Sequence, residues 1–549
     1  MGFKMIRKRW IVLIVIVMIG SALRVINLGG KSLWLDEIIT ALFTFGQGYP
    51  VIPRERLFSI EAIPDFFQYQ GQSCSQIAEF LVQDSTHPPF FFCLLHRWLG
   101  WQEFLGGFDA SLAVQLRVLP ALLGMVAIVL VYYFNQQAFS ERAGLASAGV
   151  MALSPFAVYL SQEARQYSLL LVLITIALLA LIRIVKSTQS RFVDWLIWGI
   201  ANSLGAYTHY FFFLSFVAQI ITLLVFFVWK SPRRLFLLAG VTGGVILSYL
   251  PWFPHLMTHF SSAKNSWLPS FDWFAPIYQI ILGLIVMVIT FPVENQPTLI
   301  QVISVLIMLA FSGWLLYQGS RGYRQLLSNP RTQVVTRVLS LYLILILLQF
   351  LLIIYGLEKN IAIAPRYNYV YYPAICSLFG ASLIARTEQK TLRFSRQLFS
   401  IYGLIGIFSC LFVVWNFFFL KPYFPEVTAE RFNQSSAPML IAMGYQDEID
   451  LALGLSYGFA LNEIRDPALH SQFIFLDRNQ GYDRIWEKIS RLPLDVSQLW
   501  VIGTGLRQVD FPEALSLSAS GKCQRDRANY YRIGIPYQRY QCSPVGVTE

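Results

Sequence analysis

Long apolar runs separated by short polar turns repeat along most of the chain. The runs long enough to cross a bilayer lie near 10–28, 115–136, 143–160, 168–185, 194–208, 211–229, 235–253, 299–317, 338–356, 367–385 and 398–420. A helix needs about 20 apolar residues to cross the hydrocarbon core of a membrane. The pattern therefore predicts a polytopic α-helical membrane protein with about 11 to 13 transmembrane helices.

Two further apolar stretches are predicted not to cross. Residues 90–104 follow a Pro-Pro pair and contain His96, Arg97 and Glu103, which favours an amphipathic helix along the outer interface. Residues 273–291 are long and apolar enough to cross, but an extra span there would move the basic 321–337 turn to the other side. We therefore expect an interfacial or re-entrant segment at 273–291.

Composition agrees with a membrane protein. The chain has 549 residues, of which 56% are hydrophobic and 13% charged, with a mean hydropathy of +0.53. This is more apolar surface than soluble domains can bury. The net charge of +11 comes from basic residues placed between apolar runs, not from one basic patch interleaved with aromatics, so we expect no nucleic-acid binding.

The basic turns predict the orientation of the chain. They contain Arg142, then Arg183, Lys186 and Arg191, then Lys230, Arg233 and Arg234, then Arg321, Arg324, Arg331 and Arg337, and finally Arg386, Lys390, Arg393 and Arg396. With the spans above, all these turns fall on one side, which the positive-inside rule makes cytoplasmic. The first run lacks a small-residue cleavage site and is expected to stay as an anchor. We predict a protein of the plasma (inner) membrane with a cytoplasmic amino terminus.

The last part of the chain predicts a different kind of structure. Residues 1–420 form the expected transmembrane domain, with a long first extracytoplasmic loop at 29–114, and residues 421–549 are polar enough for a soluble domain. Short apolar runs such as 473–476 and 499–502 are typical of buried strands alternating with helices. An odd number of spans places this small α/β domain outside the cytoplasm, where Cys523 and Cys542 could form a disulfide.

Polar residues that could take part in catalysis or binding gather in the outer turns. They comprise Asp36 and Glu37 after the first span, His87 before Pro88-Pro89, Glu163 and Arg165 in the turn at 159–167, Tyr207, His209 and Tyr210 at 207–210, and Arg366 with Tyr367 before the tenth span. The inner turns hold mostly plain positive charge. Because chance would divide such clusters between both faces, a shared outer cavity is the simplest account.

These residue types suit the transfer of a sugar from a lipid phosphate. Such a reaction needs a base for the acceptor hydroxyl and cations for the departing phosphate. We expect Asp36 to be the base, supported by Glu37, and His87, Arg165 and Arg366, with Tyr367 and His209, to bind the donor phosphate. Glu163 with Asp36 could also hold Mg²⁺ or Mn²⁺, although no contiguous ligand motif is present.

Several of these segments carry a family resemblance. They are the acidic pair at 36–37, His87-Pro88-Pro89, Arg117-Val118-Leu119-Pro120, and Ser154-Pro155 leading into 162–167. Their order resembles the GT-C glycosyltransferases, and more narrowly the dolichyl-phosphate-mannose protein mannosyltransferase-like branch with the bacterial aminoarabinose transferases. The similarity is most specific over about 30–215 and does not extend to the carboxy-terminal domain.

The resemblance implies both a fold and an activity. The fold is a multi-span core whose first outer loop forms two membrane-parallel helices over the active site. The activity is transfer from a polyprenyl-phosphate sugar to a protein, lipid or glycan acceptor, with Asp36 activating the acceptor and inversion at the anomeric centre. The 162–165 turn lacks an aspartate that several relatives carry, which affects the roles of His87, Glu163 and Arg165 more than that of Asp36.

Structural alternatives remain open for each residue. Asp36 and Glu37 could cap a helix, His87 could be a turn residue, Glu163 and Arg165 could form a local ion pair, Tyr207, His209 and Tyr210 could belong to an interfacial aromatic belt, and Arg366 could snorkel to headgroups. Two other function classes also remain. One is a transporter or flippase for a lipid-linked or anionic substrate, and the other is a membrane scaffold that displays its carboxy-terminal domain.

Overall fold

The computed structural model describes residues 2–106, 110–189, 191–227, 231–260, 272–388, 390–493, 496–518 and 521–543, so Lys230 of the predicted basic turns lies outside the described residues. The chain divides into two compact units. We call Met1–Leu28, Ser85–Leu94 and Val114–Leu420 the helical unit, and Gly29–Asp84, Leu95–Ala113 and Lys421–Glu549 the sheet unit. Most of the predicted first loop is thus grouped with the carboxy-terminal residues, while the domain limits 1–420 and 421–549 stay a prediction.

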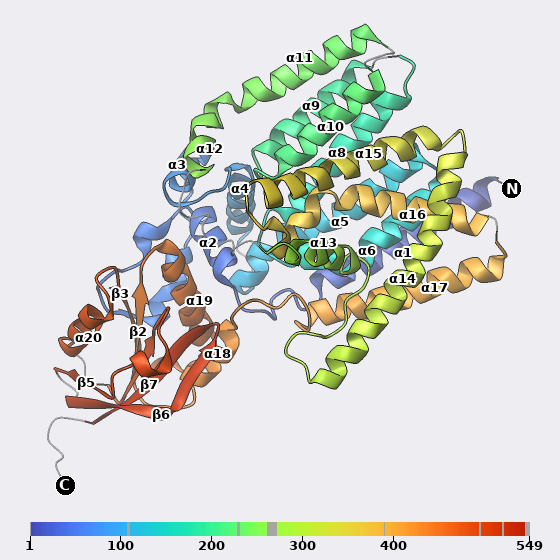
Figure 1. The fold of residues 1–549 in the computed structure, drawn as a ribbon. Helices are drawn as coiled ribbons and strands as arrows, with labels where there is room; N and C mark the ends of the chain where they lie inside the picture. The colour runs from blue at the N-terminus through green and yellow to red at the C-terminus, as the bar shows by residue number, and fades with distance from the viewer. Residues whose placement is uncertain are drawn as a thin grey trace. The chain divides into compact units, whose positions relative to one another are not determined.

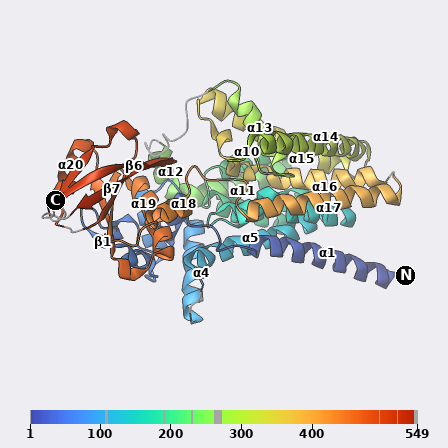
Figure 2. The same cartoon turned by 90° about the horizontal axis from the view of Figure 1, so that it is seen from below.

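Long helices make up the helical unit (Figure 1). They are α1 (Gly2–Val25), α5 (Leu112–Ala138), α6 (Glu141–Ala152), α7 (Pro155–Ser161), α8 (Tyr167–Lys186), α9 (Phe192–Ala206), α10 (Phe212–Phe227), α11 (Pro232–Tyr249), α12 (Phe253–Phe260), α13 (Ala275–Ile285), α14 (Thr298–Ser328), α15 (Gln333–Leu351), α16 (Tyr372–Glu388) and α17 (Leu392–Val414). Helix α8 is apolar and buried on nearly all sides, and α9, α10, α15 and α16 pack around it. Helix α14 packs against α16, and α17 contacts both α16 and α1 (Figure 2).

Each of the eleven predicted spans coincides with helical structure, but the predicted number of spans is not confirmed. By length and composition, six helices among the described residues could cross a membrane, or seven if α6 and α7, which meet at 62°, count as one broken span. Several of the others are too short for this test, such as α9 with 15 residues and α10 with 16. The protein is mostly helical and has membrane-spanning helices.

The two stretches predicted not to cross are both helical. Helix α4 (Phe90–Phe104) has the predicted bounds. Helix α13 covers 11 residues of the 273–291 stretch. At 1.5 Å per residue it is roughly 16 Å long, about half of the hydrocarbon thickness. Helix α13 alone is therefore too short to cross the membrane. This length agrees with an interfacial or re-entrant segment.

A buried arginine stabilises the break between α6 and α7. Ser154 caps α7 through its hydroxyl and Pro155 occupies the first turn, so the chain restarts in a new direction. The last carbonyls of α6 lose their helical partners at this break. Arg24 of α1 donates to the carbonyls of Met151, at 2.9 Å, and Ala152, at 3.3 Å. The break directs α7 toward the 162–166 turn, which carries Glu163 and Arg165.

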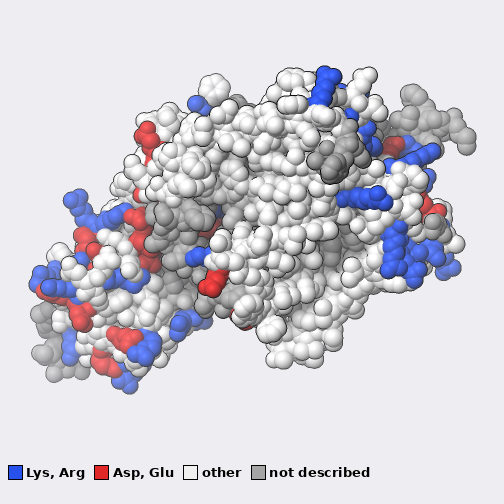
Figure 3. Space-filling view, turned by 45° about the horizontal axis from the view of Figure 1, so that its top comes forward, with Lys and Arg blue, Asp and Glu red and all other residues white. Residues whose placement is uncertain are grey.

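The basic helix ends of the helical unit lie together. Lys186 donates to the carbonyl of Gln137 at 2.7 Å, and Arg234 donates to that of Thr188 at 3.1 Å. Arg9, near the start of α1, forms an ion pair with Glu141 in the first of these turns. The first three basic turns therefore share one end of the helices, and Leu326 and Ala381, near the other two basic turns, pack against Ala143 at this end. Elsewhere a broad stretch of the surface carries no charged side chain (Figure 3), and exposed apolar residues such as Phe236 and Leu316 suit contact with lipid.

A mixed sheet organises the sheet unit. Its strands β1 (Phe58–Ser59), β2 (Met439–Tyr445), β3 (Ser471–Asp477), β4 (Gln498–Ile502), β5 (Ala514–Leu517), β6 (Gly521–Ile533) and β7 (Ile535–Ser543) follow the order β1-β3-β2-β4-β7-β6-β5. Strand β2 is parallel to both β3 and β4, and α19 (Glu448–Ile464) and α20 (Tyr482–Ser490) make the crossovers. The predicted strands at 473–476 and 499–502 are confirmed, and their continuous burial explains their apolar sequence.

Residues of the first loop complete this unit. Strand β1 pairs antiparallel with the edge strand β3, with Phe58 opposite Phe473. Helix α2 (Leu35–Thr44) and the short helix η2 (Ile60–Phe67) pack on α19, while α3 (Cys74–Asp84) and α18 (Pro425–Phe432) complete the helices of the unit. Cys523 and Cys542 face each other on β6 and β7 and form the expected disulfide.

Candidate active site

Four turns of the helical unit meet at the end of the helices opposite the basic turns. They are the 85–89 turn, the 162–166 turn, the 207–211 turn and η7 (Pro365–Val370). The amide of Phe90 donates to the carbonyl of Tyr207 at 3.0 Å, which joins the first turn to the third. Helix α8 separates this end from the basic end by its 20 residues, about 30 Å.

His87 and Arg165 are in direct contact. A guanidinium only donates hydrogen bonds, so the 3.0 Å contact between Arg165 Nη2 and His87 Nε2 makes Nε2 an acceptor. The proton of the neutral imidazole then lies on Nδ1, which donates to Ser85 Oγ at 3.0 Å. Burial lowers the pKa of His87 well below its usual value, and the charges of Arg165 and Arg366 lower it further. His87 is therefore uncharged, and its Nε2 holds the guanidinium of Arg165 in place.

His209 has the opposite tautomer. Its Nδ1 accepts the amide hydrogen of Phe211 at 3.1 Å and lies 3.2 Å from the hydroxyl of Tyr369. Because the amide must donate, the imidazole proton sits on Nε2. Burial, followed by the charges of Arg165 and Arg366, lowers the pKa of His209 to about 3. At neutral pH this side chain is an uncharged hydrogen-bond donor.

We call Arg165, Arg366, His87, His209 and Tyr369 the anion cluster. Arg366 lies over the ring of Tyr367 at 5.7 Å, and its charge lowers the pKa of both histidines. The rings of His87 and His209 are 6.1 Å apart. Two guanidinium groups, the Nε2–H of His209 and the hydroxyl of Tyr369 thus converge at one place. Such a set is suited to an anion with several oxygens, such as a phosphate.

The structure therefore brings together all five residues predicted to bind phosphate. His87, Arg165, His209, Arg366 and Tyr367 come from separate segments and lie in or beside the cluster. Their roles stay proposals. Three further residues were not predicted from the sequence: Tyr369 of the cluster, Tyr167, whose ring lies 5.8 Å from that of Tyr369, and Ser85 beside His87. Their proximity to the predicted turns was the only available signal, since tyrosine and serine are common at membrane interfaces.

Glu163 lies in the same turn as Arg165 and is buried. Its predicted role was a metal ligand together with Asp36. Among the residues that the structure describes, no three His, Cys, Asp or Glu side chains come together as a metal site. A divalent cation held by Glu163 and Asp36 therefore stays a prediction.

Asp36 and Glu37 belong to the first turn of α2, in the sheet unit. Glu37 is fully buried, and its carboxylate lies 3.5 Å from the amide of Trp34, as in a capping box. Asp36 is partly exposed. The structural alternative thus accounts for Glu37, whereas the role of Asp36 stays a proposal.

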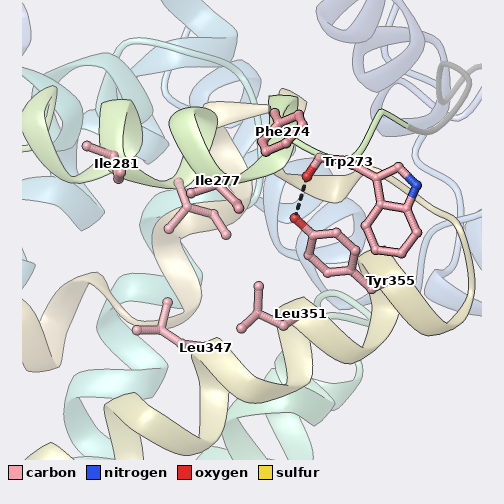
Figure 4. Close-up of a pocket in the computed structure, with 8 residues that line it drawn as sticks. Trp273, Phe274, Ile277, Ile281, Leu347, Leu351 and Tyr355 are labelled. Atoms are coloured by element: carbon pink, nitrogen blue, oxygen red, sulfur yellow. Dashed lines mark hydrogen bonds between the residues drawn. The ribbon is translucent and has the colours of Figure 1, made fainter.

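An apolar groove lies on the helical unit (Figure 4). It has a volume of about 750 Å³ and is lined by Trp273, Phe274, Ile277, Ile280, Ile281, Leu347, Leu351 and Tyr355. The hydroxyl of Tyr355 donates to the carbonyl of Trp273 at 2.9 Å and closes one end. Further along α13, Gly283 packs against Asn368 so tightly that a Cβ would lie 2.3 Å from its Nδ2. Helix α13 therefore joins the groove to η7, which carries Arg366.

Comparisons with known proteins agree with this architecture. Residues 96–257 match the family model described as dolichyl-phosphate-mannose-protein mannosyltransferase. No curated protein matches the chain. The crystal structure of ArnT from Cupriavidus metallidurans bound to undecaprenyl phosphate has a TM-score of 0.54, with 13% identity over 98% of both chains. Its apo form has a TM-score of 0.51, with 11% identity over 98% of both chains.

A third similar structure is longer than this chain. It is the oligosaccharyltransferase from Archaeoglobus fulgidus in complex with Zn and sulfate, with a TM-score of 0.48 and 14% identity, covering 89% of this chain and 68% of that one. At such identities the similarities concern the fold. Together with the family match over residues 96–257, the fold shared with ArnT confirms the predicted resemblance: this membrane protein is similar to the GT-C glycosyltransferases of the mannosyltransferase-like and aminoarabinose-transferase-like kind.

Proposed function

We propose that this protein transfers a sugar from a polyprenyl-phosphate donor to a hydroxyl of a protein, lipid or glycan acceptor at the extracytoplasmic face of the membrane. The observation that carries the proposal is the anion cluster, in which Arg165 and Arg366 meet two neutral histidines and a tyrosine. Arg165 is buried and Arg366 half-buried, and guanidinium groups beside uncharged donors suit the oxygens of a phosphate. The ArnT structure with undecaprenyl phosphate supports a lipid phosphate as that anion.

In the proposed reaction, Asp36 accepts the proton of the acceptor hydroxyl as its oxygen attacks the anomeric carbon. The bond between this carbon and the phosphate oxygen breaks, and polyprenyl phosphate leaves with the bonding electrons. Arg165 and Arg366 stabilise the charge that develops on the phosphate, while His209 donates from Nε2. One direct displacement leaves no sugar on the enzyme and inverts the anomeric centre. No step uses the predicted divalent cation.

The apolar groove provides room for the lipid part of the donor. Its walls are almost entirely hydrocarbon, and α13 links it to the segment that carries Arg366 (Figure 4). A polyprenyl chain outside the groove already lies in lipid, so the groove would add little hydrophobic free energy, and its main effect would be to orient the chain.

The purified protein in lipid bilayers should release polyprenyl phosphate from a labelled polyprenyl-phosphate hexose in the presence of acceptor. Thin-layer chromatography of the lipid fraction would measure the release, with protein-free bilayers as the control. A transporter or flippase would move the labelled lipid between leaflets without cleaving the sugar–phosphate bond. Movement without cleavage would overturn the proposed reaction.

The proposed orientation places the sheet of the carboxy-terminal domain outside the cytoplasm. A cysteine at the exposed Val509 should react with a membrane-impermeant maleimide in intact cells, whereas one at the exposed Arg331, in a basic turn, should react only after lysis. Native Cys376 and Cys410 are buried and should contribute little background. The reverse pattern of labelling would place the anion cluster on the cytoplasmic side.

A further inference from the structure

Gln166 occupies the turn that begins α8 and is completely buried. Among the described residues, neither its Oε1 nor its Nε2 has a hydrogen-bond partner. Its backbone carbonyl accepts the amide hydrogen of Leu170 at 3.1 Å, as the first helical turn requires. The local fold thus uses the backbone of Gln166 and leaves its carboxamide unused.

An unused buried carboxamide is unfavourable for folding. A buried polar group without a partner costs on the order of 1–3 kcal/mol, and a methionine of similar size would avoid that cost. Gln162, four residues earlier, shows what a structural glutamine does in the same turn. Its Nε2 donates to the carbonyls of Ile26, at 2.9 Å, and Leu23, at 3.3 Å, at the end of α1. Gln162 therefore provides a matched comparison.

The two residues beside Gln166 in the chain place its turn next to the anion cluster. Arg165 contacts His87 in the anion cluster, and the ring of Tyr167 lies 6.2 Å from that of His209. The cluster already supplies positive charge for a phosphate. A carboxamide both donates and accepts, which matches a hydroxyl group better than a phosphate oxygen. In a lipid-phosphate donor, the hydroxyls nearest to the phosphate belong to the attached sugar.

We propose that the Gln166 carboxamide hydrogen-bonds a hydroxyl of the sugar that is attached to the donor phosphate, and so recognises the sugar. This inference rests on the proposed function and extends it to the part of the donor that sequence analysis left open. A site with a buried group that only the correct substrate satisfies discriminates strongly against analogues that lack the hydroxyl. Gln166 would contribute to the choice of sugar while Arg165 binds the phosphate.

The test compares Gln166→Met with Gln162→Met in the full-length protein in lipid bilayers. Binding of undecaprenyl phosphate, undecaprenyl phosphate glucose and undecaprenyl phosphate mannose is measured without acceptor, together with the melting temperature. In Gln166→Met we expect an unchanged or higher melting temperature and undecaprenyl phosphate affinity within about twofold. The extra affinity that a sugar confers should fall about tenfold, as for the loss of one good hydrogen bond. Gln162→Met should instead lower the melting temperature.

Three results would overturn the inference. One is a drop in melting temperature for Gln166→Met as large as that for Gln162→Met, since this would show a structural role. Another is an unchanged gain in affinity from the sugar. The third is a native protein that binds neither sugar-bearing lipid more tightly than undecaprenyl phosphate. Because binding is measured without turnover, absence of transfer would count against the proposed function and leave this comparison interpretable.

Discussion

Replacing Asp36 with asparagine is expected to reduce sugar transfer by about 10²- to 10⁴-fold, the usual contribution of a general base. Asparagine has nearly the same size but cannot take the proton of the acceptor hydroxyl. Since Asp36 is partly exposed in the first turn of α2, the loss of its charge should destabilise the fold by only about 0.3–1 kcal/mol. Initial rates of polyprenyl phosphate release and the affinity for undecaprenyl phosphate would be measured on the same preparations.

Glu37→Gln is the matched control for Asp36→Asn. Glu37 is fully buried, and its carboxylate lies near the amide of Trp34, so its substitution should lower the melting temperature more than the rate per folded molecule. The affinity for undecaprenyl phosphate should stay the same in Asp36→Asn, because the residue acts on the acceptor. Full transfer activity in Asp36→Asn would rule out its role as the base.

Replacing Arg165 with alanine should have the second largest effect, a loss of undecaprenyl phosphate affinity of about 10- to 100-fold. Hydrogen bonds to charged groups contribute about 1.5–3 kcal/mol, and Arg165 is one of two guanidinium groups in the anion cluster. Arg165→Lys should recover part of this affinity, because an ammonium keeps the charge but not the two-pronged geometry. Equilibrium binding of undecaprenyl phosphate at several salt concentrations would measure the effect.

Arg331→Ala provides the control for charge alone. Arg331 is exposed in a basic turn at the other end of the helices, so it should leave undecaprenyl phosphate affinity unchanged. Arg165→Ala also removes the donor that His87 Nε2 contacts, and the pKa of His87 should rise because Arg165 is one of the charges that lower it. Equal affinities for native protein and Arg165→Ala would mean that the anion cluster does not bind the lipid phosphate.

The sequence predicted which segments carry the cluster, but not how its side chains are arranged. Arg165 and His87 are 78 residues apart, and no local pattern indicates that a guanidinium would fix the tautomer of that imidazole. Tyr369 lies 160 residues from His209 and adds a hydroxyl to the cluster. The sequence alone does not distinguish it from an ordinary tyrosine at the membrane interface. Such contacts depend on how helices pack side by side, which periodicity along one helix does not encode.

The carboxamide of Gln166 is a second feature that the structure shows and the sequence does not predict. In the sequence, Gln162 and Gln166 are two glutamines of one turn, and nothing in their neighbours separates them. In the structure, one donates to the carbonyls at the end of α1 while the other has no partner among the described residues. A glutamine that ties two helices together and one whose carboxamide makes no such contact can thus be told apart only by their surroundings.

By itself, the sequence determined the apolar helices, the separation of basic turns from chemically rich ones, the strands at 473–476 and 499–502 and the resemblance to GT-C glycosyltransferases. These properties follow from the order of residues along one segment, through hydrophobic periodicity and turn chemistry. Only the tertiary structure decided that Phe58 of the first loop pairs with Phe473, that Glu37 is a buried cap, and that Arg165 and Arg366 converge on two neutral histidines. These depend on contacts between distant segments, whose free energy comes from burial and charge in three dimensions.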